Sequence, residues 1–136
     1  MIKTLTTLLL LAQVVIGANL TDEAPIIRIA AERNGIRYKS DDWYLLLAIR
    51  LSENGRQGRE FGIMNPKANN LDKQAGWASA TIMNHHKRFG SAKVTPEFIH
   101  SLGKRYCPVG ADNDPKGLNK NWIKNVTFNY RRLKNV

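Results

Sequence analysis

The fold is decided by the stretch Ser40-Asp41-Asp42-Trp43-Tyr44-Leu45-Leu46-Leu47-Ala48-Ile49-Arg50-Leu51-Ser52-Glu53-Asn54-Gly55. A serine followed by two aspartates is a typical helix start, because the hydroxyl caps free N–H groups and the carboxylates face the positive end of the helix dipole. Apolar residues then recur at helical spacing, and the centre is apolar almost all round. The stretch therefore predicts a buried helix that begins after Ser40 and stops at Gly55.

Glu53 lies near the end of this predicted helix. Partial burial and the negative end of the helix dipole both disfavour an ionised carboxylate, so we expect its pKa to rise. A carboxylic acid that stays protonated near neutral pH can protonate a glycosidic oxygen. The alternative for a lone glutamate is an ordinary solvent-facing side chain.

Glu60 is the candidate for a second catalytic carboxylate. It lies in a glycine-spaced loop that contains Gly58 and Gly62, and the seven residues after Glu53 are enough to bring this loop back over the helix end. Glycosidases usually add a second group that stabilises the oxocarbenium ion or activates water. The alternative for Glu60 is a plain ion pair with Arg56 or Arg59.

Helical periodicity and end signals predict four further helices, at about residues 21–33, 72–89, 95–102 and 119–133. Their predicted inner faces include Ile26 in the first helix and Phe89 in the second, and Gly103 is the expected stop of the third. A short strand over residues 61–64 is the one β element expected. The predicted fold class is mainly α, with at most a small hairpin.

Residues 1–18 have the pattern of a secretory signal peptide. A lysine precedes a mostly apolar run from Thr4 to Ile16, which is shorter than the roughly 20 residues of a membrane span. A signal retained in the membrane and a buried N-terminal helix are the alternatives. Residues 19–136 would then form one exported domain, periplasmic or extracellular, with no stable membrane span.

The chain is strongly basic, with a formal net charge of +10, and only Lys3 of these cations lies in residues 1–18. Such a surface attracts anionic partners, which for an exported protein means cell-wall polymers or phospholipid headgroups. Nucleic acid is not expected, because export removes the chain from it and no nucleic-acid-binding signature is present. The alternative is a basic surface that serves solubility alone.

No cofactor or metal is expected. His85 and His86 are adjacent in a predicted helix and point in different directions, and no acidic residue stands at metal-ligand spacing from them. The sole cysteine, Cys107, excludes an internal disulfide. Exported chains without disulfides are more typical of bacterial or phage proteins.

Two sequence blocks resemble the lysozyme-like superfamily, in particular lytic transglycosylases and bacterial glucosaminidases. The first block is Ala48-Ile49-Arg50-Leu51-Ser52-Glu53-Asn54-Gly55 with Phe61-Gly62-Ile63-Met64-Asn65. In this superfamily a glutamate ends a helix, a small polar residue follows, and a Gly-Leu-Met-Gln-like segment comes next; here asparagine replaces the glutamine. The second block runs from Leu102-Gly103-Lys104-Arg105-Tyr106 through Asn113-Asp114-Pro115 to Trp122. It resembles the Tyr-Ala-x-Asp-Pro region of the glucosaminidases, with residues 107–112 as an insertion.

The resemblance covers roughly residues 43–130 and implies an α+β lysozyme-like domain that cleaves the glycan strands of peptidoglycan. Glu53 would act as general acid and then as general base, with Glu60 as the candidate partner. The residues that would bind substrate are Phe61, Gly62, Met64, Tyr106 and Asn113. Aromatic side chains stack on sugars, which makes Phe61, Tyr106 and Trp77 candidates on chemical grounds as well.

Several questions stay open at the level of sequence. A single glutamate would leave the substrate's own N-acetyl group or 6-hydroxyl to complete the reaction, whereas a second carboxylate would favour hydrolysis. The other function classes are a wall-binding module without activity and a cationic protein that binds polyanions or membranes through charge alone.

Overall fold

The computed structural model describes residues 20–107, 116–117 and 119–135, so the predicted signal peptide and Asn113 lie outside the described residues. It contains the helices α2 (Leu20–Arg33), α3 (Asp41–Glu53), α4 (Leu71–Phe89), α5 (Pro96–Tyr106) and α6 (Lys120–Lys134). The mainly α class is confirmed. The expected strand over residues 61–64 is not formed, and no other described residue is in a strand.

The helix starts follow local capping chemistry. The side chains of Ser40, Asn70 and Thr95 each accept the backbone N–H three residues ahead, at the starts of α3, α4 and α5. These bonds satisfy donors that have no partner within a helix. The first turns of all three helices also carry an acidic residue, which favours the positive end of the dipole.

Two helix ends differ from the predictions. At the end of α3 the left-handed cap is Asn54, with φ of 46°, and not Gly55. Asparagine tolerates this conformation better than most residues, which the glycine-based rule overlooks. In α5, Gly103 does not stop the helix, which continues to Tyr106. Gly103 is instead buried against α6, so its role is to permit close packing.

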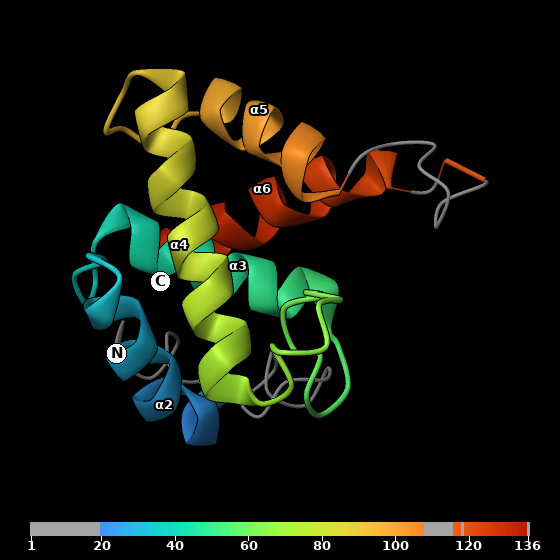
Figure 1. Cartoon of the computed structure of the whole chain (residues 1–136). Coiled ribbons are helices and arrows are strands. Elements are labelled where there is room, and N and C mark those ends of the chain that lie inside the picture. The colour runs from blue at the N-terminus through green and yellow to red at the C-terminus, as the bar shows by residue number, and fades with distance from the viewer. Residues whose placement is uncertain (1–19, 108–115, 118, 136) are drawn as a thin grey trace, which may run out of the picture.

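The core is built around α3, where every residue from Leu45 to Arg50 is buried. Helix α6 packs along α3, and α4 contacts α2, α3 and α5. Figure 1 shows α4 upright in the centre, with α2 beside its lower half and α5 near its upper end. The segment between α3 and α4 therefore returns along the C-terminal end of α3, beside the start of α4.

Two residues expected on inner faces are exposed. Ile26 of α2 is 44% exposed, because the buried stripe of this helix consists of Leu20, Ile27, Ala30 and Ala31. Phe89, the last residue of α4, is 39% exposed, although the edge of its ring still meets Phe98. Both helices form where the sequence predicts them. The prediction is wrong only in counting Ile26 and Phe89, which lie at the edge of the buried stripe, as inner residues.

The two adjacent histidines pack α4 against its neighbours. His86 contacts the Asp42 carboxylate through Nε2 at 2.7 Å and the Ser91 carbonyl oxygen through Nδ1 at 2.7 Å. His85 contacts the Ser101 hydroxyl at 2.9 Å. Both rings also pack on Phe98, so they lie in the core and hold α3, α4 and α5 together.

None of the described helices has the length and apolar character to cross a membrane.

Candidate functional site

Glu53 is the last residue of α3 and is half-buried. The indole N–H of Trp122, at the start of α6, donates to Glu53 Oε2 over 2.8 Å. Trp122 is itself buried, with its ring beside Gly103 and Tyr106 of α5. The carboxylate is thus held by a rigid side chain from a helix that begins more than sixty residues later in the sequence.

The other side of the carboxylate faces Gly62. A Cβ atom at position 62 would lie 2.3 Å from Glu53 Oε1, which is closer than any real contact. Gly62 also has φ of +73°, a conformation that side chains disfavour. Only glycine therefore fits here, because the Glu53 carboxyl fills the position that a side chain would take.

Burial raises the pKa of Glu53 above its ordinary value of 4.5, and the hydrogen bond from Trp122 opposes this rise in part. The direction is the one expected from the sequence. The larger cause is removal of the carboxylate from water, which penalises the charged form. The group therefore retains its proton to a higher pH than an exposed glutamate does.

Tyr106 lies on the same side of the molecule as Glu53. Its ring stacks on Trp122, with ring centroids 5.3 Å apart, and its hydroxyl donates to the Phe61 carbonyl oxygen over 2.6 Å. Burial, together with the nearby Glu53 charge, raises the pKa of Tyr106 well above its usual 10.0. Tyr106 therefore stays neutral, and it connects α5, α6 and the loop that carries Gly62.

The loop itself is held in place by Gln74, a fully buried side chain of α4. Its Oε1 accepts the backbone N–H groups of Phe61 and Ile63, at 3.1 and 3.2 Å. Its Nε2 donates to the carbonyl oxygens of Ile63 and Ala68. One amide thus pairs four backbone groups that would otherwise need a strand partner, which positions Gly62 without any β structure.

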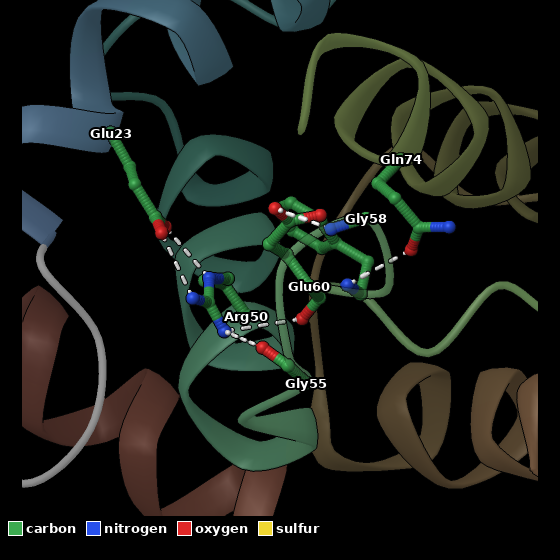
Figure 2. Close-up of polar contacts among 7 residues, drawn as sticks. Glu23, Arg50, Gly55, Gly58, Glu60 and Gln74 are labelled. Atoms are coloured by element: carbon green, nitrogen blue, oxygen red, sulfur yellow. Dashed lines mark hydrogen bonds and ion pairs between the residues drawn. The ribbon is translucent and has the colours of Figure 1, made fainter. Parts of the chain in front are cut away.

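Arg50 also anchors this loop, and Figure 2 shows its guanidinium between Glu23 and the carbonyl oxygens of Gly55 and Glu60. Its guanidinium is buried and forms a bidentate pair with Glu23 of α2, at 2.7 and 2.9 Å. The same group donates to the carbonyl oxygens of Gly55 and Glu60, at 3.5 and 3.3 Å. The polar residue inside the apolar helix therefore joins α2, α3 and the start of the loop.

Glu60 does not lie beside Glu53 in an exposed position. Its side chain is only 5% exposed, and its Oε2 accepts the backbone N–H of Gly58 within the loop. The Arg59 guanidinium donates to the carbonyl oxygens of Gly58, Asn65 and Ala68. The Glu60 carboxylate therefore neither faces a substrate position nor pairs with Arg59. It stabilises the turn at Gly58.

The structure separates the predicted substrate-binding residues. Gly62 and Tyr106 flank Glu53, whereas the Phe61 ring is fully buried in the core and contributes only its carbonyl oxygen. Met64 is 68% exposed on the same loop. Asn113 lies outside the described residues.

Trp77 belongs to a different place. It is 41% exposed and lines a groove of about 610 Å³ between α2 and α4, which none of the residues around Glu53 lines.

Sequence reasoning misses three residues that hold Glu53 and the loop beside it. The helical pattern places Trp122 in the core alone, and it does not single out Arg50 or Gln74. A signal exists for these last two, because a buried charge or amide in an apolar stretch needs a partner and so indicates a structural network. For Trp122 the polar N–H is the only signal, since buried indoles usually donate a hydrogen bond.

Within the described residues no group of three or more histidine, cysteine, aspartate or glutamate side chains is arranged to hold a metal ion. No family model, curated protein or solved structure matches this chain.

Proposed function

We propose that the protein cleaves the glycan strands of peptidoglycan, with Glu53 as its general acid and base. The observation that carries the proposal is the half-buried Glu53 carboxyl, clasped between the Trp122 N–H and Gly62, whose pKa is raised by burial. A protonated carboxyl in a partly dry position can donate a proton to a leaving oxygen. The sequence resemblance to lysozyme-like enzymes supports the same assignment.

The geometry suggests different roles for the two carboxyl oxygens of Glu53. Oε2 accepts from Trp122, so we assign the acidic proton to Oε1, which packs against Gly62. In the proposed reaction this proton passes to the glycosidic oxygen as its bond to the anomeric carbon breaks. The ionised Glu53 then accepts a proton from the incoming nucleophile, either water or the 6-hydroxyl of the same sugar.

A mechanism with one carboxylate is supported by the position of Glu60. Its carboxyl is buried, and its Oε2 accepts from Gly58 within the loop, so it does not face a sugar bound at Glu53. Where the described residues offer no second carboxylate to the substrate, the substrate's own 6-hydroxyl or N-acetyl group would complete the reaction. We therefore favour an anhydro-sugar or substrate-assisted product over attack by water activated at Glu60.

Tyr106 is proposed to shape the sugar site beside Glu53. Its ring stacks on Trp122 and its hydroxyl is bonded to the Phe61 carbonyl oxygen, so its position is fixed. The basic surface would raise the local concentration of the protein on anionic wall polymers. We place the protein outside the cytoplasm, as an exported or phage-encoded enzyme that acts on a bacterial wall.

The test compares the wild-type protein with Glu53→Gln on purified peptidoglycan. We expect the wild type to release soluble muropeptides and the variant to lose at least about a hundredfold in rate, within the range for general acid catalysis. Glu32→Gln is the matched control, because Glu32 is exposed and pairs with the exposed Arg28 of the same helix, α2. Release of muropeptides by Glu53→Gln at the wild-type rate would remove Glu53 from the proposal, and no release by the wild type would remove the activity.

A further inference from the structure

The outer face of α6 has a composition unlike that of its inner face. Its inner positions Trp122, Val126, Tyr130 and Leu133 are buried against the rest of the domain. On the opposite side of the helix, four exposed residues follow one another at intervals of three or four, and we call them the α6 outer stripe: Lys120, Lys124, Phe128 and Arg131. Residues at this spacing share one face of a helix.

The charge of this face is uncompensated in the part of the chain that the structure describes. Helix α6 contains no acidic residue. Among its basic residues, the ion pairs formed with described residues involve Lys134, which contacts Asp41 of α3 at 3.1 Å. The cations of the α6 outer stripe thus have no described carboxylate partner, and the stripe is complementary to an anionic surface.

Phe128 is the feature that charge alone does not explain. Its ring is 58% exposed in the middle of the stripe, and the Arg132 guanidinium lies 5.2 Å from the ring centroid. A hollow of about 570 Å³ runs along this face, lined by Lys124, Asn125, Thr127, Phe128 and Arg131. An exposed aromatic ring is stabilised when it enters an apolar layer beneath charged headgroups, because its apolar surface leaves water.

We propose that the α6 outer stripe docks on the surface of a bilayer that contains anionic phospholipids. Lys120, Lys124 and Arg131 would contact headgroup phosphates, while Phe128 enters the boundary of the acyl chains. Trp122, on the opposite face of the same helix, holds Glu53, so docking would present Glu53 away from the bilayer. This inference does not depend on the cleavage proposal, because the stripe and Glu53 lie on different faces of α6.

The experiment measures sedimentation of the full chain with two kinds of vesicle, phosphatidylcholine alone and an equal mixture of phosphatidylcholine and phosphatidylglycerol. The readout is the ratio of the two partition coefficients, because any contribution from the apolar residues 4–16 is common to both. Each cation near an anionic surface contributes about fivefold, so the triple variant Lys120→Gln/Lys124→Gln/Arg131→Gln is expected to lower the ratio about a hundredfold. Phe128→Ala is expected to lower partitioning to the anionic vesicles about three- to tenfold.

The matched control removes three exposed cations elsewhere, as Lys67→Gln/Lys87→Gln/Lys93→Gln. It changes the net charge equally, and we expect it to lower the ratio by less than about tenfold. Circular dichroism melting confirms that each variant is folded. Equal losses in the two triple variants would overturn the proposal in favour of diffuse charge. Binding of the same variants to soluble polyphosphate is measured in parallel. If Phe128→Ala partitions as the wild type does, and the stripe variant loses polyphosphate binding as well, the proposal is overturned in favour of a soluble polyanion.

Discussion

Gly62 illustrates how a single backbone position can determine the geometry of a carboxylate. Its positive φ and its contact with Glu53 Oε1 are two separate reasons for glycine, one a matter of conformation and the other of space. Gly90 provides the comparison, because it has a similar φ of +80° and a Cβ added there would meet no atom within 4 Å. The two glycines therefore separate backbone strain from steric displacement.

We expect Gly62→Ala to lower the free energy of unfolding by about 2–4 kcal/mol, and Gly90→Ala by about 1–2 kcal/mol, because only the first adds a clash to the strain. Denaturant unfolding measures both. The Gly62 variant should also lose muropeptide release, since the methyl group displaces Oε1. Equal destabilisation in the two variants would contradict the added clash, and muropeptide release would then show whether Glu53 has moved.

The raised pKa of Glu53 has a consequence for stability. Because the folded state favours the protonated carboxyl, its stabilising contribution is present below the ordinary pKa of 4.5 and is lost as pH rises through the folded-state pKa. We therefore expect Glu53→Gln, which cannot ionise and can still accept from Trp122, to be more stable than the wild type at pH 7. Below pH 4.5 this difference should vanish. Urea unfolding across this pH range measures it, and a difference that grows toward acid pH would contradict the burial argument.

At the level of helices, α5 and α6 approach closely because Gly103 has no side chain. A Cβ there would lie 2.6 Å from Ile123 Cγ1 and 2.9 Å from Trp122 Cε3. The glycine expected to end α5 is therefore a packing residue, and its neighbour across the contact is the residue that holds Glu53. Gly76 of α4 differs, because a Cβ there would make an ordinary contact of 3.7 Å with Asn34.

Substitution by alanine should consequently have opposite effects in the two helices. Gly103→Ala is expected to destabilise by about 1–3 kcal/mol through overpacking and to shift Trp122 away from Glu53. Gly76→Ala is expected to stabilise by about 0.5–1 kcal/mol, since alanine is the better helix former. Thermal unfolding of the two variants checks the signs. Stabilisation by Gly103→Ala would mean that α6 can move away from α5 without loss of stability.

Over the whole domain, the Arg50–Glu23 pair connects the first described helix to the loop above Glu53. The side chains are 5% and 17% exposed, so the pair is largely shielded from water. Removal of one partner leaves a poorly solvated charge on the other. The exposed Arg28–Glu32 pair, with both side chains nearly half exposed, is the contrasting case within α2.

We expect Arg50→Met to lower the free energy of unfolding by about 3 kcal/mol, and Arg28→Met by no more than about 0.5 kcal/mol. The double variant Arg50→Met/Glu23→Leu should recover part of the loss, because it leaves no unpaired buried carboxylate. A double-mutant cycle in guanidinium chloride measures the coupling. Additive effects of the two substitutions would indicate that the carbonyl contacts of Arg50, and not Glu23, carry its contribution.

The sequence by itself determined the five helices of the described residues, the caps at Ser40 and Thr95, the buried character of α3 and the position of Glu53 at its end. These features depend on residues within a few positions of one another, so periodicity and capping chemistry are sufficient to predict them. Only the tertiary structure decided that Gly62, and not Glu60, meets Glu53, and that Trp122, Gln74 and Arg50 hold the group in place. The contacts that fix this arrangement join residues far apart in the sequence, such as Trp122 with Glu53 and Arg50 with Glu23. They are selected by how the helices pack, which no local pattern specifies.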